Sequence, residues 1–278
     1  MPRVTANGIS LECHEWPGNG PAIVAIHGLT ANLTCWAPLA ESLTPQYRLI
    51  AYDLRGRGES DKPSSGYSLA LHREDLAGLL DALGLQRAVI AGHSLGANVA
   101  VAFADSHPER VEKLILVDGG FDFRAEVLDS LRPALARLDL TFPSIEVFLG
   151  LMRQLLPLVG RWNEHVERYF RYDVGAAPDG SVSSKVAKHA IEEELANLQR
   201  ERLWTLHHAI ACPTLILRAP AGLLTETDCV MTREEGEAMA RAIRESRLVA
   251  IEGENHYSIL LGKNPETLDA IRSFLKSP

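Results

Sequence analysis

Short apolar runs alternate with helical patterns in two parts of the chain, residues 1–120 and 209–278. Each run is compact and bounded by turn or charged residues, which is typical of strands buried on both faces. A leucine stripe over Ser68–Leu83, stopped by Gly84, predicts a helix, and the runs 232–244 and 265–275 are compatible with two more. Strands that alternate with helices at this spacing predict parallel βαβ units. The predicted strands are Ala22–Ile26, Tyr47–Tyr52, Ala88–Ala91, Lys113–Val117, Pro213–Leu217 and Arg247–Ile251.

The alternation stops after Asp118, and residues 121–208 have a mainly helical pattern. Four prolines break this region into pieces, namely Pro133, Pro143, Pro157 and Pro178, and segment 173–184 is predicted to be an exposed loop. We therefore predict an α/β core formed by 1–120 and 209–278. A helical cap, or lid, formed by 121–208 is inserted after the sixth strand.

Composition narrows the classes of partner. A net charge of -8 and a pI near 5.7 disfavour nucleic acid and anionic membranes, which repel an acidic surface. The four cysteines lack CxxC pairing and histidines at zinc-ligand spacing, so free thiols and no metal are expected. The N-terminal residues show no apolar signal region. We expect a cytoplasmic monomer or homodimer that acts on a small molecule and uses no cofactor.

Residues 88–100 contain a candidate nucleophile. A predicted strand leads into Gly-His-Ser-Leu-Gly at 92–96, and a small-residue helix follows. A Gly-x-Ser-x-Gly turn between strand and helix holds its serine in a strained conformation and presents the hydroxyl to solvent. Ser94 is therefore the predicted nucleophile.

A serine hydroxyl needs a base near neutral pH, and the side chain suited to that role is histidine. His256 follows the last predicted strand in a glycine-led loop, C-terminal to Ser94. We predict that His256 is the base. Strand alternation predicts that His93 points away from Ser94, although its place beside the nucleophile makes it a candidate for substrate binding.

These motifs resemble the α/β-hydrolase superfamily over nearly the whole chain. Residues 26–29, Ile-His-Gly-Leu, are similar to the turn whose backbone helps to form the oxyanion hole, and 53–60 are similar to the family's Asp-x-Arg-Gly-x-Gly-x-Ser loop. The resemblance implies that the N–H groups of Leu29 and Leu95 bind the developing oxyanion. For His27 a buried hydrogen-bonding role is favoured over direct chemistry.

The acid of the triad departs from the family pattern. The usual carboxylate position after the strand Pro213–Leu217 has no acidic residue, and Glu226 and Asp228 come later. Asp118, at the end of the preceding core strand, could accept the second ring N–H of His256, as in branches of the family that place the acid there. Asp118 is the preferred acid, Asp228 and Glu226 are alternatives, and a turn-capping role for Asp118 stays open.

The cap supplies much of the aromatic content, which favours an apolar pocket. Trp36, Phe121 and Trp162 are, with His93, the candidate substrate-binding residues. The sequence predicts a serine hydrolase that cleaves a small, largely apolar carboxylic ester or lactone through an acyl-enzyme. Carbon–carbon bond hydrolases and perhydrolases with the same triad stay open, as does a ligand receptor on the same fold.

Overall fold

The computed structural model describes residues 3–124, 127, 131, 135–223 and 228–277. Its centre is a seven-stranded sheet in which every neighbouring pair is parallel except the antiparallel pair at one edge. In spatial order the strands are β12 (Ser246–Ala250), β11 (Thr214–Arg218), β7 (Val111–Val117), β6 (Ala88–His93), β4 (Ala22–Ile26), β5 (Arg48–Tyr52) and β3 (Cys13–Trp16). All six predicted strands are present, and their carboxyl ends meet at one edge of the sheet.

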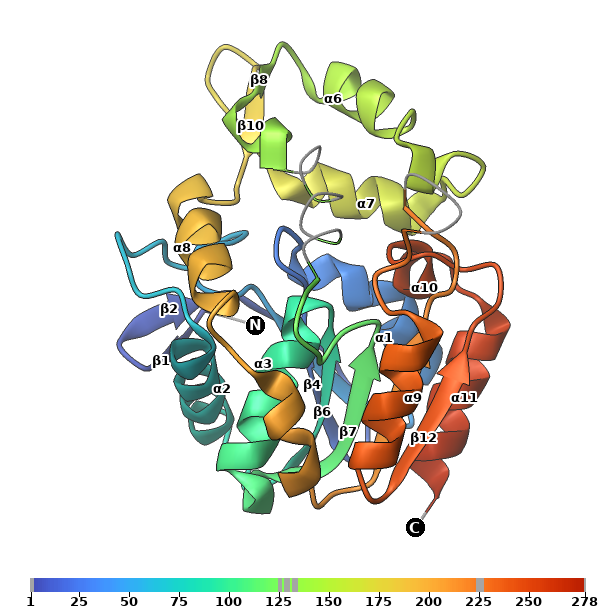
Figure 1. Cartoon of the computed structure of the whole chain (residues 1–278). Helices are drawn as coiled ribbons and strands as arrows, with labels where there is room; N and C mark the ends of the chain where they lie inside the picture. Colours follow the sequence, from blue (N-terminus) through green and yellow to red (C-terminus); the bar gives the residue numbers. More distant parts are fainter. Residues whose placement is uncertain (1–2, 125–126, 128–130, 132–134, 224–227, 278) are drawn as a thin grey trace.

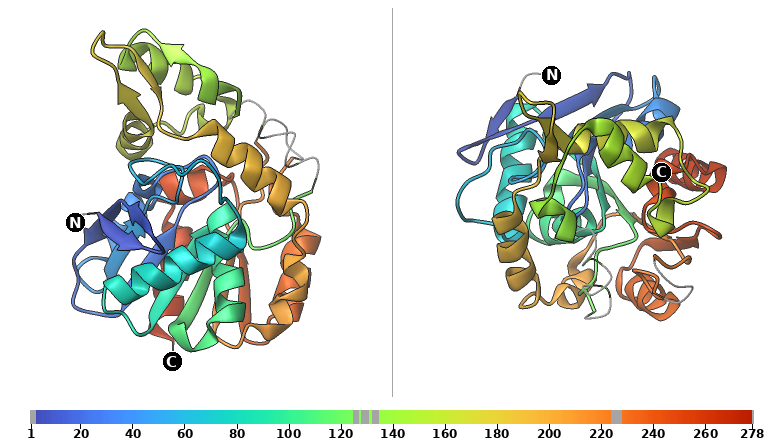
Figure 2. Two further views of the ribbon diagram at one scale, coloured as in Figure 1. Left: turned by 90° about the vertical axis from the view of Figure 1, so that its left-hand side faces the viewer. Right: turned by 90° about the horizontal axis from the view of Figure 1, so that it is seen from above.

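Side chains of the strands alternate between two cores, one on each face of the sheet. In β6, Ala88 and Ile90 belong to one core, while Val89 and Ala91 belong to the other. This explains the continuous apolar runs, because both faces of each central strand are covered. The first core lies under α2 (Leu69–Ala82), α3 (Leu95–Ser106) and α9 (Arg233–Ala242), and the second under α1 (Ala37–Leu43), α10 (Ser258–Leu261) and α11 (Pro265–Lys276) (Figures 1 and 2).

The N-terminal strands differ from the predicted scheme. β1 (Val4–Ala6) and β2 (Ile9–Leu11) pair with each other in a separate hairpin, and β3 closes the edge of the large sheet. The strand that precedes the insertion, predicted as the sixth, is β7. Counted along the chain, β7 is the fifth strand of the large sheet, because β1 and β2 do not belong to that sheet.

Residues of the inserted segment lie over the carboxyl ends of the strands (Figures 1 and 2). Within the described residues it includes the helices α6 (Ile145–Met152), α7 (Glu164–Asp173) and α8 (Lys188–Leu198), and it also forms a small antiparallel sheet of β8 (Thr141–Phe142), β10 (Val182–Ser184) and β9 (Val174–Ala176). The prediction of an exposed loop at 173–184 is correct for residues 176–180, which are exposed, and wrong for the two ends of the segment. This segment contains the β9–β10 hairpin, because Val174 and Val182 alternate inward and are buried in the cap. The division at 120 and 208 stays a prediction.

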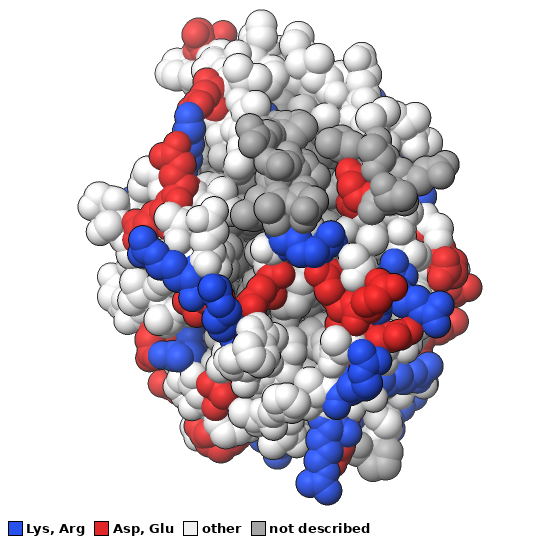
Figure 3. Space-filling view, in the orientation of Figure 1, with Lys and Arg blue, Asp and Glu red and all other residues white. Residues whose placement is uncertain are grey.

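Short 3₁₀ turns complete the described chain: η1 (Leu33–Trp36), η2 (Pro108–Arg110), η3 (Arg137–Asp139), η4 (Leu156–Leu158), η5 (Leu203–Thr205) and η6 (His207–Ala209). On the face shown in Figure 3, acidic and basic side chains are interspersed. No helix in the described ranges is long and apolar enough to cross a membrane.

Candidate active site

Ser94 lies between the end of β6 and the first residue of α3. Its φ of 56° and ψ of -122° are strained for a residue with a side chain. Neighbouring glycines make this turn possible, because a Cβ on Gly96 would lie 2.1 Å from Ile26 O and one on Gly119 would lie 2.4 Å from Ser94 O. The glycines let the backbones of β4 and of the segment after β7 approach the turn that holds Ser94.

His256 and Asp118 are brought together from different strand ends. Asp118 follows β7, His256 lies in the loop after β12, and Nδ1 of His256 is 2.7 Å from Oδ2 of Asp118. Asp118 is fully buried, and its Oδ1 accepts a hydrogen bond from the Ala219 N–H at 3.1 Å. The carboxylate can only accept, so Nδ1 carries the proton and Nε2 is left as an acceptor.

The two alternative acids of the triad are Asp228 and Glu226. Oδ1 of Asp228 accepts from the Leu223 N–H at 2.7 Å, an interaction within its own loop. Glu226 lies outside the described residues. Among the described residues, Asp118 is the carboxylate that contacts His256.

The two residues predicted to supply the oxyanion donors, Leu29 and Leu95, lie next to Ser94. Leu95 is the first residue of α3, so its N–H has no acceptor within the helix. A Cβ on Gly28 would lie 3.1 Å from the Ser94 Cβ and 3.6 Å from its Oγ, which places the Gly28–Leu29 peptide beside the nucleophile. Both residues thus lie next to Ser94, as the predicted oxyanion hole requires, and their role stays a prediction.

His27 holds the peptide unit that contains the Leu29 N–H. Its Nε2 accepts from the Leu54 N–H at 2.9 Å, so its Nδ1 is the donor, and this atom lies 2.8 Å from Gly28 O. Gly28 O belongs to the same peptide unit as the Leu29 N–H. Complete burial lowers the pKa of His27 to about 3, which keeps the ring neutral.

His93 does not point away from the site, and that expectation is wrong. It lines the same cavity as Ser94 and His256, because its position at the very end of β6 places it in the turn. Its Nε2 donates to the backbone O of His256 at 2.9 Å, and the two rings lie 4.4 Å apart. Burial and then the neighbouring His256 ring hold the pKa of His93 well below its usual value. The neutral His93 ring therefore supports the His256 loop.

The cavity that contains Ser94 encloses about 480 Å³, including its open mouth. None of the described lining residues is Asp, Glu, Lys or Arg. The lining consists of Gly28, Leu29, Thr30, Ala31, Cys35, His93, Ser94, Leu131, Tyr169, His256, Tyr257, Leu260 and Leu261. Several of these are neighbours of Leu29 and His256 in the sequence, so adjacency could have identified them. Tyr169 comes from α7, and no sequence motif marks it.

Three predicted pocket residues lie outside this lining. Trp36 is fully buried in the core beneath α1, and Trp162 stacks on Phe170 with ring centroids 5.8 Å apart. Phe121 faces a separate cavity with Trp204 and His207. Aromatic content alone did not predict where these three rings lie, because their positions depend on tertiary packing. Within the described residues no group of three His, Cys, Asp or Glu side chains could hold a metal, and the four cysteines are free.

Comparison with known proteins identifies the class. Residues 21–263 match the model of the alpha/beta hydrolase fold family, and the chain belongs to this family. It is 29% identical over 277 residues to the 2-(acetamidomethylene)succinate hydrolase of Mesorhizobium japonicum, covering 98% of this chain and 94% of that one. A crystal structure of E-2-(acetamidomethylene)succinate hydrolase superposes with a TM-score of 0.86 at 26% identity, covering 99% and 98% of the two chains.

Other matches are partial or show only the fold. An uncharacterized protein of Mycobacterium tuberculosis is 39% identical over 139 residues, which are 47% of this chain and 41% of that protein. This chain thus spans about two fifths of the length of that relative. The enol-lactonase of Burkholderia xenovorans LB400 has a TM-score of 0.77 at 23% identity, with 99% and 100% of the chains covered. Apart from the uncharacterized protein, the matches described above are hydrolases by name, as expected of an enzyme of this family.

Proposed function

We propose that this protein is a serine hydrolase that cleaves a small, neutral carboxylic ester or lactone through an acyl-enzyme intermediate. The observation that carries the proposal is the meeting of Ser94, His256 and the buried Asp118 at one edge of the sheet, with Ser94 and His256 in one cavity. A strained serine beside an oriented histidine is the arrangement that acyl transfer requires.

In the proposed mechanism, Ser94 Oγ attacks the substrate carbonyl carbon while His256 Nε2 takes the hydroxyl proton. Asp118 holds the Nδ1–H tautomer and stabilises the imidazolium that forms. The Leu29 and Leu95 N–H groups bind the oxyanion of the tetrahedral intermediate. His256 then returns the proton to the leaving alcohol. A water molecule, deprotonated by the same nitrogen, releases the acid and regenerates Ser94.

The charge of the cavity supports a neutral substrate. The 2-(acetamidomethylene)succinate hydrolase takes, by its name, a succinate derivative, and this relative makes an amide-bearing carboxylate the second candidate substrate. Arg137 is a buried cation beside the cavity, where its Nη2 donates to the O of the lining residue Thr30 at 3.2 Å. Its Nη1 is paired with the buried Asp173, so its charge is already balanced. We therefore place neutral esters and lactones before carboxylates.

Labelling with a fluorophosphonate probe, followed by p-nitrophenyl acetate hydrolysis, tests the function. Wild-type protein should be labelled on the peptide that contains Ser94 and should turn over the ester, whereas Ser94→Ala should do neither. Absence of labelling in folded protein would refute the enzyme assignment. Labelling with negligible turnover would favour a ligand receptor. A series of acyl chain lengths and lactone ring sizes, compared with 2-(acetamidomethylene)succinate, then separates the two substrate classes.

A further inference from the structure

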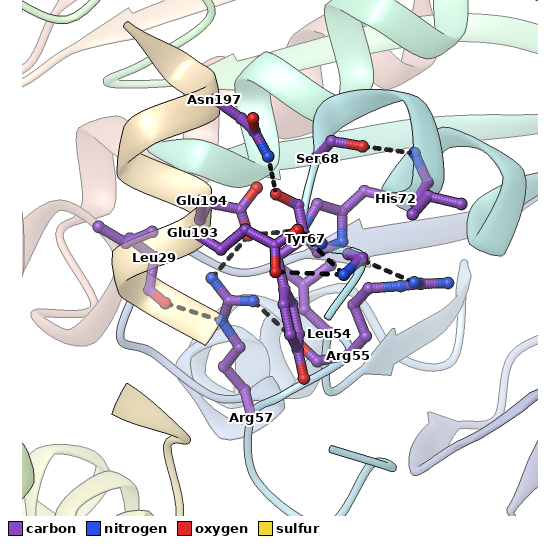
Figure 4. Close-up of polar contacts among 12 residues, drawn as sticks. Leu29, Leu54, Arg55, Arg57, Tyr67, Ser68, His72, Glu193, Glu194 and Asn197 are labelled. Carbon is purple, nitrogen blue, oxygen red and sulfur yellow. Dashed lines mark hydrogen bonds and ion pairs between the residues drawn. The ribbon is translucent and has the colours of Figure 1, made fainter. Parts of the chain in front are cut away.

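A buried ionic cluster, whose residues do not themselves line the cavity, joins the cap to the core. It consists of Arg57 in the loop after β5, His72 on α2 and Glu194 on α8, and none of these three side chains is exposed to solvent. Oε2 of Glu194 lies 2.8 Å from Arg57 Nη2 and 2.7 Å from His72 Nε2 (Figure 4). The proposed mechanism gives these groups no role.

The guanidinium of Arg57 connects this cluster to residues 26–29, the turn that is predicted to supply an oxyanion donor. Its Nε donates to Leu29 O at 3.0 Å, its Nη1 to Arg55 O at 2.8 Å and its Nη2 to Glu194 (Figure 4). A planar guanidinium whose three nitrogens all have partners is fixed in position. His27 fixes the peptide that carries the Leu29 N–H, and Arg57 fixes the carbonyl that follows it. Leu29 is therefore held on both sides by side chains.

Glu194 is the partner that makes the buried Arg57 tolerable. Burial would raise the pKa of the Glu194 carboxyl, but His72 and Arg57 outweigh this and hold its pKa at about 2, so Glu194 is ionised near neutral pH. Removing one partner of a buried ion pair leaves an uncompensated charge, and the remaining group then moves toward solvent or rearranges. A displaced Arg57 would release Leu29 O.

Helix α8 also docks on the same loop through contacts that do not involve Arg57. Ala187 N–H donates to Gly56 O at 2.8 Å, and Glu193 accepts from the Gly66 N–H at 3.0 Å. Glu193 also accepts from the Tyr67 N–H at 3.0 Å (Figure 4). Glu193 and Glu194 are thus neighbouring carboxylates on one cap helix that both bind the core. Only the second of this pair contacts Arg57, which makes the first a matched control.

We propose that Arg57 is a positioning residue for the oxyanion hole, and that Glu194 of the cap helix α8 sets its position. Docking of the cap is thereby coupled to the geometry of the Leu29 N–H, through the second variable position of the Asp-x-Arg-Gly-x-Gly-x-Ser loop. This inference rests on the proposed function, since it assigns its consequence to the same oxyanion hole.

The test compares Glu194→Gln with Glu193→Gln and adds Arg57→Lys. Lysine keeps the buried charge but lacks the planar guanidinium that binds three partners. Oxyanion binding exists only in the transition state, so a misplaced donor lowers kcat and leaves KM nearly unchanged. Because loss of a whole donor lowers kcat about 10²–10³-fold, we expect Glu194→Gln and Arg57→Lys to lower kcat about 10–100-fold with KM within about threefold. A trifluoromethyl ketone, whose Ser94 adduct carries the oxyanion, should bind more weakly by a similar factor. Glu193→Gln should change each value less than about threefold.

Equal losses of kcat in Glu194→Gln and Glu193→Gln, or a change in KM alone, would overturn the proposal. Hydrogen exchange of the backbone amides in residues 28–33 separates this result from failure of the proposed function. If wild-type protein does not turn over esters, the function fails, and the exchange measurement still decides the coupling. Faster exchange in Glu194→Gln and Arg57→Lys than in Glu193→Gln supports it, and equal exchange in all three overturns it.

Discussion

Replacement of Asp118 by Asn tests the acid of the proposed triad with little disturbance of the fold. Asp118 has a φ of 46°, a left-handed conformation that Asn adopts more readily than most residues. The Oδ1 of Asn can still accept from the Ala219 N–H, which is 3.1 Å away in the native protein. The change is thereby confined to the 2.7 Å contact with His256 Nδ1.

At that contact an Asn side chain can donate its amide N–H, which turns Nδ1 into the acceptor and places the ring proton on Nε2. His256 then cannot take the Ser94 proton, and the imidazolium loses its buried carboxylate. We expect kcat/KM to fall about 10⁴-fold, or about 5 kcal/mol of transition-state stabilisation. The free energy of unfolding should change by no more than about 2 kcal/mol.

The assay is kcat/KM for a p-nitrophenyl ester, with circular dichroism and urea unfolding on the same samples. Asp228→Asn is the matched control, because its Oδ1 can keep the bond from the Leu223 N–H, and its kcat/KM should stay within about threefold of wild type. A loss below tenfold in Asp118→Asn together with a large loss in Asp228→Asn would refute the assignment. If both variants stay active, Glu226→Gln is the next test, and a Ser-His dyad becomes the better description.

Three further predictions address the base His256, the turn that holds Ser94, and His27 beside the predicted oxyanion hole. His256→Ala should lower kcat by several orders of magnitude with an unchanged circular dichroism spectrum, and activity within tenfold of wild type would contradict its role. Gly119→Ala should abolish most ester hydrolysis, because the new Cβ would lie 2.4 Å from Ser94 O. An active variant would show that the turn at Ser94 can shift to accommodate this Cβ. The pKa of His27 is about 3 in the folded protein, compared with about 6.5 in the unfolded chain. Between these two pH values only the unfolded chain takes up the proton, so stability is lost as the pH falls from about 6.5 toward about 3. In urea unfolding between pH 4 and 6, His27→Asn should therefore reduce the slope of stability against pH by about 1 kcal/mol per unit, and parallel slopes would contradict this.

The fold was predictable where local pattern and tertiary position agree. Strands such as Ala22–Ile26 read directly as apolar runs, because both of their faces are buried. The hairpin at 174–184 was missed because its glycine and serine content is typical of a loop, and only packing within the cap makes it a sheet. The short first strands carry no continuous apolar run.

The site was predictable as far as motifs reach. Ser94 and His256 stand in recognisable turns, and the missing carboxylate after β11 pointed to Asp118. The orientation of His93 was not predictable, because alternation ends where β6 gives way to the turn. The placement of Trp36 in the core and of the half-buried Trp162 against Phe170, rather than in the cavity lining, depends on tertiary packing, which no local signal encodes. The same is true of the contact between Arg57 and Glu194, which are far apart in sequence.

The central claim is that Ser94 forms an acyl-enzyme, and mass spectrometry of acid-quenched protein during ester turnover tests it most directly. The account predicts an acyl adduct on the peptide that contains Ser94, with at most one acyl group per chain. It also predicts that the adduct forms much more slowly in His256→Ala. Turnover with no adduct at early times, or an adduct on a different residue, would contradict the account.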